Sequence, residues 1–143
     1  MIRTEAEHAQ ARSRLLEEKK RLHEHEASMK EAGLDAEQLK RAMDPLRSFT
    51  LQLEEEVESY ERMQRGSFDP IKNLAGLGRL LIAARVFAGL SQRDLAKRLD
   101  VHESQISRDE RNEYRGITVE RANRILEAVG EVELLSTMRP RSR

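Results

Sequence analysis

The side chains that could carry metal or acid–base chemistry are few and scattered along the chain. Four histidines occur, at His8, His23, His25 and His102, and His23 and His25 point to different faces of any helix that holds both. There is no cysteine, which excludes disulfides, thiolate zinc sites, iron–sulfur clusters and cysteine nucleophiles. No phosphate-binding loop, nucleophile elbow or paired-carboxylate constellation occurs. The sequence therefore predicts a protein that is not an enzyme and holds no metal and no cofactor.

Short helices with clear starts and stops are expected in the second half of the chain. They are Leu80 to Ala88, a helix that follows the Ser91 cap and ends before Asp100, Glu103 to Arg111, and a helix between Thr118 and Gly130. The second and third of these helices are joined by the turn 100–102, and the small Ala96 lies where they cross. Two short helices with such a turn indicate a helix-turn-helix.

Residues 89–111 strongly resemble the Cro-and-lambda-repressor type of helix-turn-helix, the xenobiotic-response-element family. The segment reads GLSQRDLAKRLDVHESQISRDER. Its Gly-Leu-Ser-Gln start, the Leu-Ala pair, the Val at the turn exit, the Ile-Ser pair and the Glu that ends the third helix match in type and spacing. The resemblance covers roughly residues 77–130 and implies a lambda-repressor-like DNA-binding domain of four to five helices.

The resemblance also implies which side chains read DNA bases. Glu103, Ser104 and Arg108 occupy the positions on the recognition helix that face base edges in the major groove. An arginine suits the O6 and N7 acceptors of guanine, and a glutamate suits the amino group of cytosine. The implied partner is therefore double-stranded DNA.

Other matching positions imply supporting roles. Contacts to the DNA backbone, which set register and orientation, are expected from Gln92, Arg111, Tyr114 and Arg115. Arg85 and Glu110 match the family's ion pair between the first and third helices. Such a pair orients the recognition helix more than it stabilises the fold.

The segment departs from the family pattern at two positions. Asp100 stands where the turn usually has glycine, and aspartate tolerates the left-handed conformation that this turn needs. Asp109 stands where an apolar core residue is usual, and an unpaired buried carboxylate is costly. Either Asp109 pairs with Arg79, Arg85 or Arg121, or the third helix is rotated slightly.

The first half of the chain predicts an antiparallel helical hairpin. Thr4 with Glu7, and Asp35 with Gln38, are capping boxes, and Gly33 and Gly66 are plausible helix stops. Pro45 follows Asp44 inside the second helix, so either the helix kinks there or a short helix ends and a new one begins. The fold class expected for the whole chain is all-α, with domains at 1–66 (hairpin) and 77–143 (DNA binding) and a linker at 67–76.

The second helix of the hairpin carries more apolar surface than the thin stripe of the first can cover. Its seam has the 3.5-residue period of a coiled coil. The face predicted to meet a second copy of the chain, or another protein, comprises Leu46, Phe49, Leu53, Val57 and Tyr60. The alternative is that Phe68, Ile71 and Leu74 of the linker, or the helix from Leu80, cover that face within one chain.

Composition sets the broad class of the protein. The 143 residues carry 26 basic and 26 acidic side chains, and only 3% are aromatic. The first residues are polar, unlike a signal peptide, and the longest apolar run, Leu80 to Ala84, is too short to span a membrane. We therefore expect a cytoplasmic protein without a membrane partner.

Two functions fit these features. The first is a sequence-specific transcriptional repressor that binds a two-fold operator as a homodimer through a recognition helix at 103–111. The second is an antitoxin-like interaction module, in which the hairpin binds a toxin or another protein and DNA binding serves autoregulation.

Overall fold

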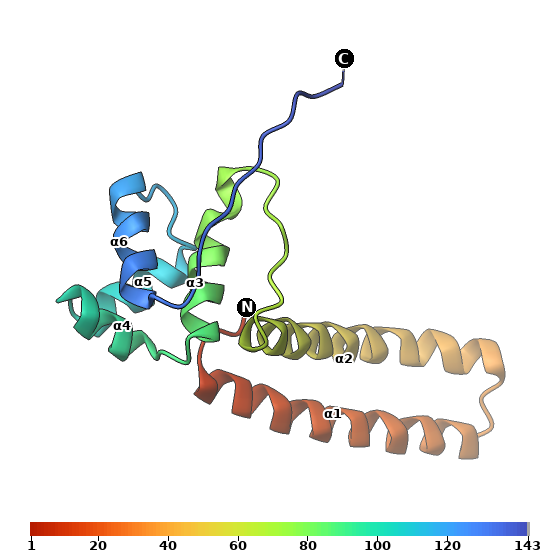
Figure 1. The fold of residues 1–143 in the computed structure, drawn as a ribbon. Coiled ribbons are helices and arrows are strands. Elements are labelled where there is room, and N and C mark those ends of the chain that lie inside the picture. Colours follow the sequence, from red (N-terminus) through yellow and green to blue (C-terminus); the bar gives the residue numbers. More distant parts are fainter. Residues whose placement is uncertain (143) are drawn as a thin grey trace. The chain divides into compact units, whose positions relative to one another are not determined.

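The computed structural model describes residues 1–142, which contain helices and no strands. The chain divides into two compact units, Met1–Arg65 and a second unit that starts at Gly66. The elements are α1 (Glu5–Glu31), α2 (Ala36–Gln64), the 3₁₀ turn η1 (Leu74–Gly76), α3 (Leu77–Phe87), α4 (Gln92–Leu99), α5 (Glu103–Arg111) and α6 (Val119–Val129) (Figure 1). The prediction of an all-α fold is confirmed.

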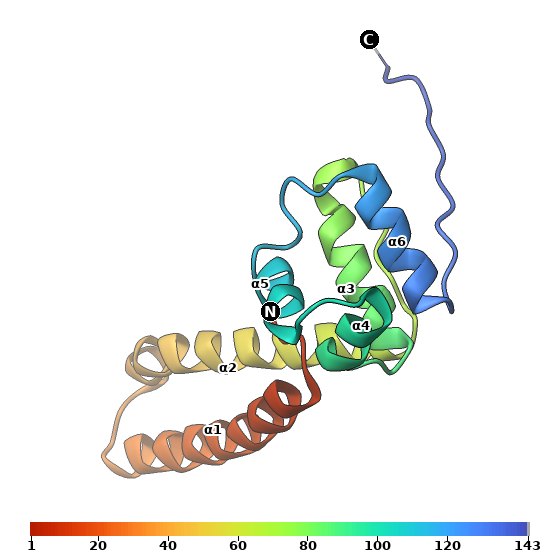
Figure 2. The same cartoon turned by 90° about the vertical axis from the view of Figure 1, so that its left-hand side faces the viewer.

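The first unit is the helical hairpin, with α1 and α2 packed side by side and antiparallel (Figures 1 and 2). Its turn uses Gly33 at φ +88°, a conformation that favours glycine. Asp35 and Gln38 form the complete capping box, with hydrogen bonds of 2.8 and 3.1 Å between each side chain and the other residue's N–H. Thr4 caps α1 by accepting the Glu7 N–H, and the Glu7 carboxylate accepts the Arg3 N–H.

Helix α2 continues unbroken through Pro45 from Ala36 to Gln64. Of the two alternatives that the sequence left open, the one in which a short helix ends near residue 44 and a new one begins is therefore wrong. Proline donates no hydrogen bond to the carbonyl one turn earlier, at Arg41. Residues 41, 44 and 45 are all exposed, so water can satisfy that carbonyl and the helix tolerates the proline.

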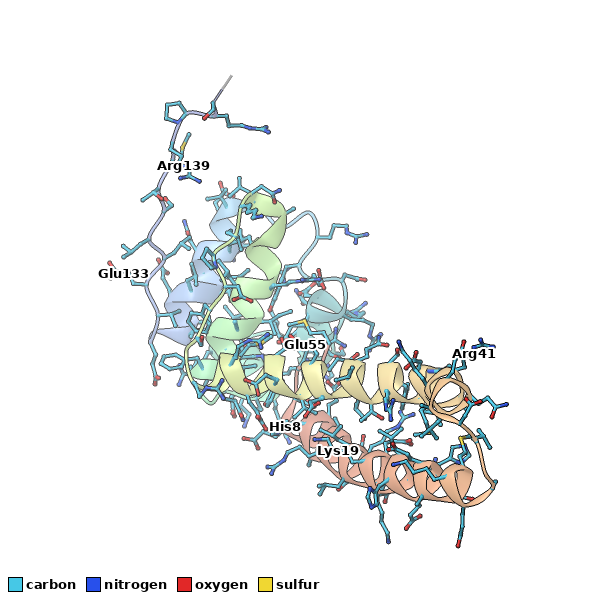
Figure 3. The ribbon with its side chains drawn as sticks, turned by 90° about the vertical axis from the view of Figure 1, so that its right-hand side faces the viewer. His8, Lys19, Arg41, Glu55, Glu133 and Arg139 are labelled. Atoms are coloured by element: carbon cyan, nitrogen blue, oxygen red, sulfur yellow. The ribbon has the colours of Figure 1, made fainter. Side chains whose placement is uncertain are left out.

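Polar contacts join the two helices along their length. His8 lies 3.1 Å from the Glu61 carboxylate, and its ring packs against Tyr60 at a centroid distance of 4.8 Å. Nearer the middle of the hairpin, Lys19 pairs with Glu54 at 2.9 Å. Figure 3 shows His8 and Lys19 on α1, with Arg41 and Glu55 on α2. The range of α1 contains no buried residue, which agrees with its thin apolar stripe.

The second unit packs α3 to α6 around one apolar core. Each helix contributes at least one side chain that is almost fully buried: Leu81 and Ile82 from α3, Leu95 from α4, Ile106 from α5, and Ile125 and Val129 from α6. Arg98 on α4 also donates a hydrogen bond of 2.8 Å to the Ala128 carbonyl at the end of α6. This bond joins α4 to α6 and satisfies a carbonyl that the helix itself leaves open.

The start of α3 lies against the turn that follows α5. A Cβ at Gly78 would lie 1.8 Å from the carbonyl oxygen of Glu113, so only glycine fits there. Helix α3 begins at Leu77, three residues before the expected Leu80, which brings Gly78 into the helix. This close approach of two main chains ties the first helix of the unit to the end of α5.

The segment before α3 is partly anchored within the second unit. Phe68 packs edge-on against Phe87, with ring centroids 5.8 Å apart. Leu74, expected to pack on a neighbour, is 80% exposed because it begins the exposed turn η1. Only part of the expected linker therefore contributes apolar contacts.

No single helix among residues 1–142 is both long enough and apolar enough to cross a membrane. The bent pair Leu74–Phe87 and Gln92–Leu99, with 102° between its members, reaches that length and composition jointly. Within this pair, Leu81, Ile82 and Val86 of α3 are buried in the core of the second unit, whereas Phe87 is 38% exposed.

Candidate nucleic-acid interface

Helix α4 and the turn after it are fixed by local hydrogen bonds. The Ser91 hydroxyl accepts the Asp94 N–H at 3.0 Å, and the Asp94 carboxylate accepts the Ser91 N–H at 2.9 Å. These hydrogen bonds hold the pKa of Asp94 below its ordinary value. At the other end, Asp100 has φ +55° and ψ +46°, the left-handed conformation expected at this turn.

Helix α5 is held by a buried ion pair on its inner side. Arg85 of α3 donates to both carboxylate oxygens of Glu110, through Nε and through Nη2, the latter at 2.8 Å. Its Nη1 donates to the Leu90 carbonyl at 2.8 Å. The two charged side chains are only 3% and 0% exposed. Ile106, one turn before Glu110 on α5, is also fully buried.

Gln92 contributes to the same cluster. Its side-chain amide donates to Glu110 Oε2 at 3.3 Å, so the half-buried side chain connects the start of α4 with the end of α5. Gln92 was expected to contact phosphate, and its amide nitrogen already has a partner inside the unit.

The outer side of α5 carries the three side chains predicted to read bases. Glu103, Ser104 and Arg108 are all exposed. Arg108 lies back along the helix, with its Nε 3.4 Å from the Ser104 carbonyl oxygen. The guanidinium of Arg108 is thereby placed over the first turn of α5, on the same side as Ser104.

Asp109 is accommodated by an ion pair with Arg121 of α6. Of the three arginines that the sequence left open, Arg85 pairs with Glu110, and Arg79 lies 3.3 Å from Glu113. The Asp109 and Arg121 side chains are 24% and 30% exposed, so the carboxylate is neither unpaired nor fully buried. The pair stands where the resemblance implied an apolar residue.

Tyr114 does not lie on the surface, which corrects its expected contact with the DNA backbone. The residue is 4% exposed, and burial together with the negative charge of Glu110 raises the pKa of its phenol above the ordinary value. The cause is the backbone: Glu113 and Tyr114 have φ values of +52° and +51°, which turn the chain inward directly after α5. Arg111 and Arg115, the other residues expected there, are exposed.

Sequence reasoning missed the part that His102 plays. This residue is the N-cap of α5, and its Nδ1 accepts the Ser104 N–H at 3.1 Å. Helix N-caps are usually Ser, Thr, Asp or Asn, so a histidine gives little signal in the sequence. Only its position directly before Glu103, the first residue of the predicted helix, indicated that His102 could be the N-cap.

The residues of the face predicted on α2 differ in burial. Val57 and Tyr60 are buried, Leu53 is half-buried, and Leu46 and Phe49 remain 42% and 41% exposed. Arg14 of α1 lies over the Phe49 ring, 5.0 Å from its centroid. The exposed apolar part of this face therefore centres on Leu46 and Phe49.

Among residues 1–142, no three histidine, aspartate or glutamate side chains gather as metal ligands would.

Comparison with protein families matches residues 81–135 to the family described as Helix-turn-helix. No curated protein and no solved structure matches the chain. The matched range contains α4, the turn at Asp100 and α5. Residues 81–135 therefore carry a helix-turn-helix domain, the kind of domain through which transcription regulators bind DNA.

Proposed function

We propose that the chain is a sequence-specific transcriptional repressor of the Cro-and-lambda-repressor type, which binds a two-fold operator as a homodimer with α5 in the major groove. One observation carries this proposal. Helix α5 exposes Glu103, Ser104 and Arg108 on one side, while Ile106 and Glu110 hold its other side in the core. A rigidly anchored helix with a polar outer face is what base recognition requires.

The chemistry of the exposed side chains supports particular targets for each of them. Arg108 keeps both Nη groups for the O6 and N7 acceptors of guanine, because only its Nε contacts the Ser104 carbonyl. Glu103 accepts from the amino group of cytosine. Arg111 and Arg115, exposed at the end of α5 and beyond it, bind phosphates and fix the register. The proposed activity is binding and not catalysis.

Two copies of the chain are part of the proposal because one recognition helix covers only a few base pairs. The face at Leu46 and Phe49 supplies a contact for the second copy. Exposed leucine and phenylalanine side chains on one helix favour association through a two-fold axis, the commonest symmetry of homo-oligomers.

Selection of bound duplexes from random DNA, with light scattering of the same protein, tests this function. The expected result is a single enriched site with two-fold symmetry and a mass of two chains. The absence of any enriched sequence would refute sequence-specific binding, and a monomeric mass on the enriched duplex would refute the homodimer.

A second candidate is an antitoxin-like role for the hairpin. The observation that favours it is a separate first unit that exposes Leu46 and Phe49, and also Leu16 and Leu51, without belonging to the matched domain. In the full chain, Leu46→Asp with Phe49→Asp should abolish the dimer, whereas Leu16→Asp, the control, should not. If the dimer survives the double change, the face at Leu46 and Phe49 is not the dimer interface, and binding of a different protein becomes its proposed role.

A further inference from the structure

The N-cap of α5 makes two contacts with one residue. His102 Nδ1 lies 3.1 Å from the main-chain nitrogen of Ser104 and 2.8 Å from its hydroxyl oxygen. Both His102 and Ser104 are exposed, so the pair lies on the outer surface of the unit at the start of the recognition helix.

Both contacts are hydrogen bonds in only one tautomer of His102, in which the Nδ1 lone pair is shared between two donors. A main-chain N–H can only donate, so Nδ1 accepts and carries no hydrogen. The Ser104 hydroxyl, 2.8 Å from the same unprotonated nitrogen, is therefore the donor in the second contact. The neutral imidazole then carries its hydrogen on Nε2.

This arrangement removes one of the two abilities of the Ser104 hydroxyl. A free serine hydroxyl donates or accepts and can contact any base edge. With its hydrogen directed at His102, the Ser104 oxygen offers only lone pairs to an incoming base. In the major groove the donors are the amino groups of adenine and cytosine, whereas guanine and thymine present acceptors at the equivalent position.

We propose that His102 is a specificity-determining residue, which makes Ser104 an obligate acceptor and so selects adenine or cytosine, over guanine or thymine, at the base facing Ser104. The inference rests on the proposed function, because it requires α5 to lie in the major groove. Glu103, the neighbouring carboxylate, is also an acceptor, so the first turn of α5 presents acceptors and Arg108 presents the donor.

The experiment first finds the position that Ser104 reads. Duplexes are selected from random DNA with the full-length protein and with Ser104→Ala, and the position whose base preference disappears in Ser104→Ala is the one that Ser104 faces. Four duplexes that differ only there are then titrated with each protein. The unaltered chain should favour adenine or cytosine on the facing strand by about two- to tenfold, the range expected for one hydrogen bond.

Three histidine variants then test the role of His102. His102→Ala frees the Ser104 hydroxyl, so the preference should fall below about twofold although Ser104 is present. His102→Asn keeps an acceptor at the N-cap and should retain the preference. His23→Ala, which removes an exposed histidine from α1, is the control and should change nothing. Circular dichroism of each variant verifies that it is folded.

Each result separates this inference from the function on which it rests. An unchanged preference in folded His102→Ala overturns the role of His102, as does a preference of the unaltered chain for guanine or thymine, while DNA binding stands in both cases. If the unaltered chain enriches no sequence at all, the proposed function and the inference fail together.

Discussion

Replacement of Glu110 by alanine should destabilise the second unit strongly. The Glu110 carboxylate is fully buried and accepts two hydrogen bonds from Arg85 and one from Gln92. Its removal takes away both carboxylate oxygens to which the buried Arg85 guanidinium donates, and the hydrogen bond from Nη1 to the Leu90 carbonyl stays in place. Loss of one partner of a buried pair costs about 3–5 kcal/mol. At roughly 4–8 °C for each kcal/mol in a domain of this size, the melting temperature should fall by more than about 12 °C.

Urea denaturation of the full-length protein, followed by circular dichroism and compared with Arg79→Ala, measures this loss. Arg79 and Glu113 form an exposed pair in the same unit, and removal of one member should cost about 0–1 kcal/mol. If the free energies of unfolding of Glu110→Ala and Arg79→Ala differ by less than about 1 kcal/mol, which is the size of a surface ion pair, the buried-pair reasoning is refuted.

A double variant separates stability from orientation. Arg85→Met with Glu110→Leu replaces the ion pair by apolar side chains, which should restore most of the lost stability. If the ion pair aims α5, this stable variant should still lose discrimination between selected and random DNA. Equal discrimination in the double variant and the unaltered chain would show that the pair has no orienting role.

Three further predictions concern single residues of the second unit. Arg108→Ala should cost about 1–3 kcal/mol on the selected duplex and much less on random DNA. The control is Arg124→Ala, which removes an exposed arginine of α6. Equal loss on both DNAs would limit Arg108 to phosphate contact. A Gly→Ala change gains about 1 kcal/mol in an exposed helix. Gly78→Ala should instead cost about 2 kcal/mol or more, measured by urea denaturation, because the new Cβ meets the Glu113 carbonyl. A gain in stability would contradict the close approach. Because the pKa of the Tyr114 phenol is raised in the folded chain, the unfolded chain loses that proton at lower pH. The free energy of unfolding should therefore fall as pH rises above about 10, and less steeply in Tyr114→Phe. Identical alkaline slopes in the two proteins would exclude Tyr114 as the cause of the pH dependence.

The limits of α4, α5 and α6 could be predicted because most of the signals that set them are local, whereas α3 begins three residues before the expected Leu80. Ser91 and Thr118 each cap a helix by accepting an N–H three residues further on, and Gly130 ends α6 at φ +77°. Such hydrogen bonds depend on residue type and spacing alone. Helix α5 also begins and ends where the sequence placed it, at Glu103 and Arg111, although its cap is His102.

The features that sequence reasoning left open depend on how the helices are placed in space. Three arginines matched the charge of Asp109, and only the packing of α5 against the start of α6 selects Arg121. The burial of Tyr114 depends on two successive left-handed residues that are not glycine, a conformation that few sequence patterns indicate. Its inward direction could not be predicted from residue type.

The arginines that face inward also change how salt acts on DNA binding. Proteins that neutralise phosphates release condensed counterions, and the affinity falls with salt by a logarithmic slope of about 0.9 for each phosphate contacted. Arg85 and Arg121 are paired with the carboxylates of Glu110 and Asp109 within the second unit, so they release no counterions. Under the proposed function, the slope reports exposed cations such as Arg111 and Arg115. A count of positive charges in the sequence therefore overstates the ionic-strength dependence of this protein.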